Sequence, residues 1–149
     1  VLAAEGGDTR NLARLASRLG RANAAGDIMV DGAERYLALR DRHERQAALA
    51  ASSFDRSAFA ALPEEIRLRL LVRAINRYGH EGPAELGKAE ALLAALDLAA
   101  QESARRRKRP GTSQTRLKLT LAGALVSLID DRIRIEPSPP RRRRTVKKV

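Results

Sequence analysis

The spacing of apolar residues changes once along this chain, and that change limits the folds open to it. Up to about residue 103, apolar residues recur at intervals of three and four, which is typical of amphipathic helices. From Leu117 onward, leucines alternate with polar residues such as Arg116 and Lys118, which is typical of half-buried strands. We therefore predict a mainly α fold: a helical bundle with a long N-terminal helix, followed by a small antiparallel β-sheet or hairpin.

The first two predicted helices have recognisable starts or stops. One runs from about Thr9 to Arg42. Its three glycines leave a break near residues 25–27 open, because Gly costs about 1 kcal/mol relative to Ala inside a helix. The next helix begins at Pro63, followed by two acids that favour the positive end of a helix. We expect it to stop at Gly79 in the left-handed conformation.

The third predicted helix runs from about Pro83 to Ser103. Its expected inward-facing residues include Leu86, Ala89, Leu92, Leu93, Leu96 and Ala100. Between the first two helices, residues 43–55 show no clear period, and we read them as a connection or a short extended piece. One helical turn is expected at residues 57–62.

Composition and period together predict four regions. Residues 1–104 form the helical domain, 105–115 a basic linker, 116–137 a small β appendage, and 138–149 a disordered polybasic tail. Within the appendage, Ala124–Ile129 and Arg132–Glu136 are expected to be strands. Gly123 would make one tight turn, and the two aspartates at 130 and 131 the other.

The charge of the chain is concentrated at one end. The net charge is +11, yet residues 1–100 contain 14 basic and 14 acidic residues. The remaining 49 residues contain 15 basic and 4 acidic ones. Such a distribution predicts a neutral scaffold with a basic end that binds a polyanion, or else a solubilising tail.

Several classes of function find no support in the sequence. There is no cysteine, which excludes disulfides and thiolate metal sites and fits the cytoplasmic location that we expect. No apolar run approaches the roughly 18 residues that span a bilayer, so we expect no membrane partner. No phosphate-binding glycine loop and no nucleophile–base pair is recognisable, so no catalytic residue, cofactor site or metal site is assigned to this chain.

Basic residues form two candidate nucleic-acid-binding surfaces. On the first helix, four arginines fall within an arc of about 80°, with leucines on the opposite side. They are Arg10, Arg14, Arg18 and Arg21. A second set could share one face of the predicted sheet: Arg116, Lys118, Arg132 and Arg134. The alternative for each set is an ordinary solvated face. Because aromatic residues are scarce, we expect contacts to a nucleic-acid backbone rather than stacking on unpaired bases.

The order of motifs resembles the tRNA(Ile)-lysidine synthetases, particularly the alphaproteobacterial type. Residues Val1–Gly6 look like the stretch just after that family's ATP-pyrophosphatase domain, and Leu12–Leu19 is similar to its long helix. Residues Leu62–Leu71 look like its central helical segment. The late hairpin is matched by Thr120–Gly123 followed by the strand Arg132–Ile135.

This resemblance implies a role in tRNA modification. The family joins lysine to the wobble cytidine of an isoleucine tRNA through an ATP-adenylated intermediate. Its Ser-Gly-Gly-x-Asp-Ser loop is absent here, so ATP and magnesium would bind a covalently linked domain upstream. The expected partner of this chain is tRNA, and the helical domain would be the part that engages it. Two alternatives stay open: a free-standing basic nucleic-acid-binding protein, and a non-catalytic structural helical module.

Overall fold

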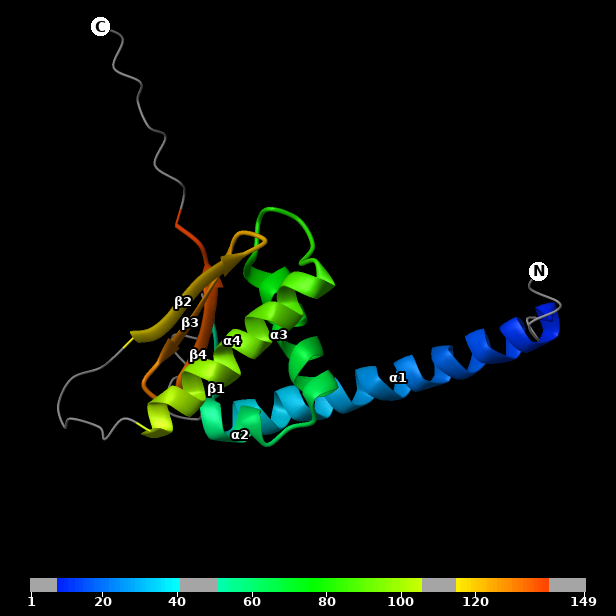
Figure 1. Ribbon diagram of the computed structural model, residues 1–149, viewed down its shortest axis with the longest axis horizontal. Coiled ribbons are helices and arrows are strands. Elements are labelled where there is room, and N and C mark those ends of the chain that lie inside the picture. Colours follow the sequence, from blue (N-terminus) through cyan, green and yellow to red (C-terminus); the bar gives the residue numbers. More distant parts are fainter. Residues whose placement is uncertain (1–7, 41–50, 106–114, 140–149) are drawn as a thin grey trace, which may run out of the picture.

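A computed structural model describes residues 8–40, 51–105 and 115–139 of the chain, and Figure 1 shows their arrangement. The chain is mainly helical, with a long N-terminal helix and a small antiparallel sheet, as predicted. The helices are α1 (Thr9–Arg40), α2 (Arg56–Ala60), α3 (Glu64–Tyr78) and α4 (Leu86–Arg105). The strands are β1 (Ser52–Asp55), β2 (Thr115–Leu121), β3 (Ala124–Ile129) and β4 (Arg132–Pro137). None of the described helices is long and apolar enough to cross a membrane.

The sheet has four strands in the order β1-β4-β3-β2, all antiparallel. Strands β2 and β3 are joined by a two-residue turn in which Ala122 and Gly123 both have positive φ, at 51° and 78°. Such turns match the right-handed twist of the strands they connect. The outer strand β1 comes from the stretch between α1 and α3, so of the two readings given to residues 43–55, the extended one holds for Ser52–Asp55.

One hydrophobic core joins the sheet to the helices. Helices α3 and α4 pack against one face of the sheet, as Figure 1 shows. That face is lined by Val126, Leu128, Ile133 and Ile135, which are buried together with the apolar stripes of both helices. The rings of Phe54 in β1 and Phe59 in α2 stack with their centroids 5.7 Å apart. Residues of β3 and β4 therefore share one hydrophobic core with the helices that precede them.

Helix α1 is one continuous helix, as predicted, so the alternative of a break near residues 25–27 does not hold. Two other details differ from the predictions. Helix α4 begins at Leu86 rather than Pro83, and Leu86 is exposed, because in the first turn it lies beyond the edge of the core. Gly79 ends α3 with φ −73° and ψ 150°, so the expected left-handed stop is wrong.

Gly79 is explained by close packing instead. A Cβ atom at this position would overlap the carbonyl oxygen of Ala122 and lie 2.8 Å from that of Ile75. The backbone of the β2–β3 turn lies directly against the end of α3. Just beyond that end, the amide of Glu81 donates a hydrogen bond to the Ala122 carbonyl at 3.1 Å. Glycine lets helix and turn approach closely.

Candidate nucleic-acid interface

Helix α1 has a free half and a docked half. Every residue from Thr9 to Ala25 is exposed, and we call this segment the arm. In Figure 1 the arm extends well clear of the sheet and the other helices. The buried residues of α1 all lie further along, at Val30, Ala33 and Leu37. Among the described residues, the arm therefore meets the rest of the chain only near its end, at Asn23, and is otherwise surrounded by solvent.

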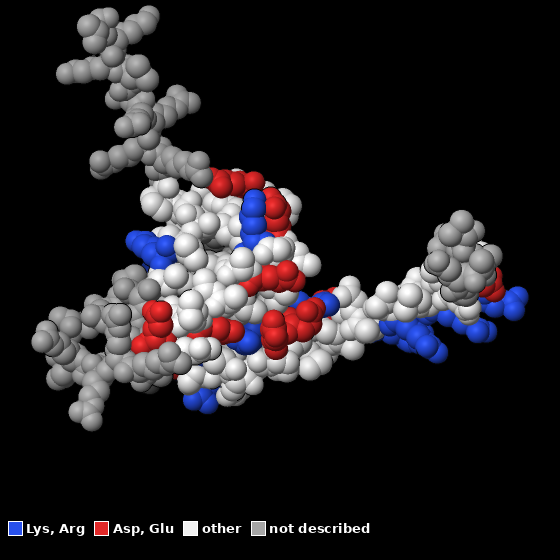
Figure 2. Space-filling model, viewed as in Figure 1, with Lys and Arg blue, Asp and Glu red and all other residues white. Residues whose placement is uncertain are grey.

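The four predicted arginines of the first helix lie on the arm. Arg10, Arg14, Arg18 and Arg21 are all exposed, and Figure 2 shows cationic side chains gathered along one side of the arm. Residues 9–25 contain no acid. Among the residues that the structure describes, no carboxylate forms an ion pair with any of the four, although Arg21 donates a hydrogen bond to the hydroxyl of Ser17 at 3.2 Å. Their charge is thus available to an external anion.

The opposite side of the arm is apolar and uncovered. Leu12, Leu15 and Leu19 are 48%, 53% and 60% exposed. The helical period correctly separates them from the arginines, but no part of the described chain packs against them. Large exposed apolar side chains at helical spacing are uncommon on a monomeric surface, where they mark contacts with other parts or partners.

The arm ends where α1 meets α3, and Arg69 of α3 marks that boundary. Its guanidinium donates hydrogen bonds to Asn23 at 2.7 Å, to Asp27 at 3.0 Å and to Glu65 at 2.6 Å. A Cβ at Gly26 would come within 3.3 Å of this guanidinium, so the glycine gives Arg69 room. The hydrogen bond to Glu65 is the main cause of a raised pKa at Arg69; burial opposes it, and the hydrogen bond to Asp27 adds to it.

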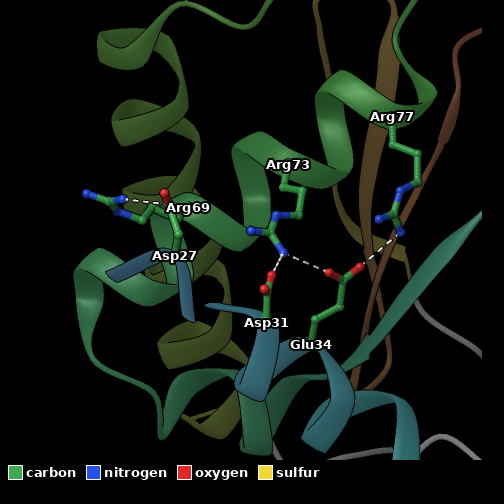
Figure 3. A network of polar contacts seen from close by, with 6 residues as sticks. All are labelled: Asp27, Asp31, Glu34, Arg69, Arg73 and Arg77. Carbon is green, nitrogen blue, oxygen red and sulfur yellow. Dashed lines mark hydrogen bonds and ion pairs between the residues drawn. The ribbon is translucent and has the colours of Figure 1, made fainter. Parts of the chain in front are cut away.

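The contact continues as a ladder of ion pairs, drawn in Figure 3. Arg73 contacts Asp31 at 2.6 Å and Glu34 at 3.1 Å, and Arg77 contacts the other oxygen of Glu34 at 2.9 Å. The hydrogen bond to Asp31 is the main cause of a raised pKa at Arg73. Together with the buried apolar residues of α1, these pairs hold its docked half, residues 26–40, against the body of the molecule, by which we mean the sheet with α2, α3 and α4.

The ladder was not predicted from the sequence, although its signal is there. Arginines recur every four residues along α3, at 69, 73 and 77, and acids recur at similar spacing along α1, at 27, 31 and 34. Each set forms one stripe on its helix. What the sequence does not provide is the pairing of these two helices, which places the stripes face to face.

The basic residues of the sheet are less available to an external anion than the arginines of the arm. Lys118 and Arg134 lie in one cross-strand row, on either side of Ser127, on the face turned away from α3 and α4. Both are exposed, but Ser127 between them is buried. Arg134 pairs with Glu136 at 2.9 Å, so part of its charge is neutralised.

The other two members of the sheet set add less. Arg132 is half-buried, and its strand partners are Ile129 and Asp55. Arg116 lies at the irregularity in β2 where the register shifts, and its side chain is outside the described residues. The predicted basic linker at 105–115 and polybasic tail at 138–149 lie almost wholly outside them too. Within the described ranges, no three His, Asp or Glu residues gather as a metal site would require.

Comparisons with known proteins point to one family. The chain is 58% identical over 144 residues to a tRNA(Ile)-lysidine synthase of Bradyrhizobium diazoefficiens, and 60% identical over 148 residues to one of another Bradyrhizobium species. A third, from Rhodopseudomonas palustris, is 50% identical over 143 residues. These matches cover 96%, 97% and 96% of this chain. No family model and no solved structure matches it.

The match covers only part of each relative. The chain spans 40% of the length of the two Bradyrhizobium proteins and 38% of the third, and the matched stretch is their C-terminal region. The predicted resemblance is thereby confirmed, with the same motif order now placed on α1, α3 and the β2–β4 sheet. The chain belongs to the tRNA(Ile)-lysidine synthase family, as a counterpart of that C-terminal region.

Proposed function

We propose that this chain is the tRNA-engaging portion of a tRNA(Ile)-lysidine synthase, and that the arm is its principal tRNA-binding element. The observation that carries the proposal is the arm's row of exposed arginines, which have no acidic partners among the residues that the structure describes. Relatives named for a tRNA substrate support the choice of tRNA among polyanions. Lysine ligation and ATP use would belong to the part of the protein that precedes the matched stretch.

The spacing of the arginines suits a phosphate backbone. From Arg10 to Arg21 the helix rises about 16 Å at about 1.5 Å per residue. Guanidinium groups spaced along this length can each contact a phosphate, in many cases through two parallel hydrogen bonds. A backbone contact of this kind positions a folded RNA and does not read its bases.

The pairing of charges distinguishes the arm from other basic surfaces of the chain. On α3, Arg69, Arg73 and Arg77 are each held by carboxylates, so binding a phosphate there would require breaking an ion pair. On the sheet, Arg134 has the same constraint. The four arginines of the arm have no such competition within the described chain, and we therefore rank the arm above the sheet set.

Replacing all four arm arginines by glutamine tests the proposal. Gln has a helix propensity close to that of Arg, so the arm should stay helical. Each lost phosphate contact should make the slope of log affinity against log salt shallower by roughly 0.7–0.9 units. Losing two to four contacts would flatten that slope by about 1.5–3.5 units. The basic residues 141–148 are kept in all variants, so their contribution cancels in the comparison.

Two variants that each remove one positive charge provide the matched control. Arg14→Gln removes one cation from the arm, and Lys88→Gln removes one from α4, where Lys88 is exposed and bound to Glu85 at 2.8 Å. We expect weaker tRNA binding from the first and no change from the second. A quadruple variant that is helical by circular dichroism yet binds tRNA with unaltered affinity and salt slope would overturn the proposal. Equal competition by duplex DNA would instead favour a general nucleic-acid-binding protein.

The chemistry forms a second part of the proposal. We expect no ATP turnover and no lysine ligation from the 149-residue chain, because its sequence lacks the phosphate-binding loop of the family. ATP with magnesium would bind the preceding part. Detection of tRNA-stimulated ATP turnover by the purified chain would contradict this assignment.

A further inference from the structure

The apolar side of the arm continues the buried stripe of α1. At about 100° per residue, Leu12, Leu15 and Leu19 fall in one arc about 60° wide. Val30, Ala33 and Leu37 of the docked half fall in the same arc, and there the stripe is buried in the core. One continuous apolar stripe is thus covered along the second half of α1, whereas along the first half it is exposed within the part of the chain that the structure describes.

We propose that the bare part of this stripe, formed by Leu12, Leu15 and Leu19, docks against the portion of the protein that precedes the matched stretch in the relatives. This inference rests on the proposed function, since it assumes that such a portion is linked to the chain. That preceding portion would present an apolar surface to the three leucines. Strand β1 and helix α3 already present such a surface to the second half of α1.

The position of the arm favours this occupant. In the relatives more than half of the length lies outside the match, and the match is to their C-terminal region. The preceding portion would therefore join the chain close to Thr9, where the arm begins. A linked partner needs little contact area, because the linker holds it at a high effective concentration.

A second copy of this chain is a weaker candidate. The arm contains four arginines and no acid between residues 9 and 25, so two arms packed through their leucines would carry eight positive charges on adjacent helices. Three leucines on about two turns of helix are also a small surface for association of separate molecules. Nothing of opposite charge on the arm would compensate.

Docking in this way would leave the arginines accessible. The centre of their arc lies about 130° around the helix from the centre of the leucine arc. One helix would then contact the preceding portion with one face and a tRNA backbone with the other. The arm would hold the RNA beside the portion to which we assign the chemistry.

Cysteine scanning can test the inference, because the chain has no native cysteine. Leu15→Cys places a thiol on the apolar side of the arm. Ser17→Cys is the matched control, since Ser17 is exposed on the arginine side. Alkylation rates are measured without tRNA, in the 149-residue chain and in the longer protein, by the mass of the peptide that contains each position.

We expect the Leu15→Cys thiol to react at least about tenfold more slowly in the longer protein than in the 149-residue chain, as groups protected by stable packing do. The Ser17→Cys thiol should react at similar rates in both. Leu19→Cys, on the same stripe, should repeat the Leu15→Cys result, so that one badly tolerated substitution does not decide the matter.

Three results would overturn the inference. Equal rates for Leu15→Cys in both proteins would mean that the preceding portion does not cover the stripe. Protection already present in the 149-residue chain and increasing with its concentration would identify a second copy as the occupant. Protection of Ser17→Cys in the longer protein would mean that docking is not confined to the apolar side. None of these measurements includes tRNA, so they are independent of whether the arginines bind it.

Discussion

The two halves of α1 have the same apolar period but opposite environments. In the docked half, Leu37 is completely buried, whereas in the arm Leu15 is 53% exposed although it lies on the same side of the helix. The acids of α1 are confined to the docked half, where Asp27, Asp31 and Glu34 bind arginines of α3. A helical period therefore identifies which side of a helix is apolar, and the distribution of charge along the helix indicates which part is held by the rest of the chain.

The arginines of α1 and α3 show the same contrast. Those of α3 are satisfied by carboxylates of this chain and stabilise its fold. Those of the arm have no carboxylate to bind among the described residues and are available for an external anion. Counting arginines would not separate these roles, because both sets recur at helical spacing; the location of nearby acids does.

The largest predicted effect compares leucines of the two halves. Leu37→Ala should destabilise the fold by about 2–5 kcal/mol, the range for removing a fully buried leucine. Leu15→Ala should change the free energy of unfolding by less than about 0.5 kcal/mol, as surface changes normally do. Chemical denaturation of the 149-residue chain measures both. Equal losses from the two variants would mean that the arm packs against the body in solution, and the distinction between the halves would fail.

Much of the fold was predictable because local signals agree with it. The strands β2 to β4 and their turns follow from the alternation after residue 115, and Gly123 and Asp130 both adopt the positive φ that tight turns require. Helix α3 begins at Glu64, directly after Pro63, and its first turn contains the two acids, as expected. In these segments the apolar side predicted from the period is the side that the core covers.

Features that depend on distant contacts were not predictable in the same way. Strand β1 is only four residues long and exists because it pairs with β4, about 80 residues further on. Gly79 was expected to provide a left-handed stop, but its role depends on the β2–β3 turn that packs against it. The four arginines of the first candidate site were placed correctly on one exposed side, whereas the bareness of the leucines opposite could not be known without the tertiary structure.

The next largest effect concerns Gly79 in the body. Gly79→Ala should destabilise the fold by about 1–3 kcal/mol, because the added methyl group overlaps backbone atoms that cannot move independently. The φ and ψ of Gly79 are acceptable for alanine, so the cost would be steric and not conformational. Thermal unfolding measures it. A variant as stable as the original chain would show that α3 and the β2–β3 turn can separate, and that the body is less tightly packed than the structure indicates.

A smaller effect should depend on pH and should be confined to the body. Hydrogen bonds from the Ser57 hydroxyl at 2.6 Å and the Ala58 amide at 2.8 Å lower the pKa of Asp55 below its ordinary value of 3.8. Because the pKa is lowered by folding, this stabilisation is complete above 3.8 and is lost as the pH falls through the folded-state value. Asp55→Ala should therefore cost about 1 kcal/mol at neutral pH, as loss of a helix cap does, and less in acid.

The arm provides the internal reference for that titration. Asp8 precedes the arm and accepts a hydrogen bond from the Arg10 amide at 3.5 Å, so the reference is the middle of the arm, from Arg14 to Arg21, where there is no acid. Amide resonances of that stretch should not follow the titration of Asp55 when the pH is lowered. Denaturation of both proteins across the acid range measures the first effect, and NMR of the original chain measures the second. A penalty for Asp55→Ala that persists unchanged well below pH 3.8 would rule out the charged cap as its cause.

The smallest predicted effect comes from filling glycines in the two halves of α1. A Cβ at Gly20 in the arm or at Gly32 in the docked half would meet nothing within 4 Å, so each Gly→Ala change should act through helix propensity alone. That gain is about 0.5–1 kcal/mol at either position. Gly32→Ala should raise the free energy of global unfolding, because the docked half unfolds with the body. Gly20→Ala should leave it unaltered and instead slow hydrogen exchange within the arm by about twofold to fivefold, since the arm opens without breaking contacts of the body. If Gly20→Ala raised the global value as much as Gly32→Ala does, the arm would be part of the cooperative core, and its leucines would have to be covered within this chain.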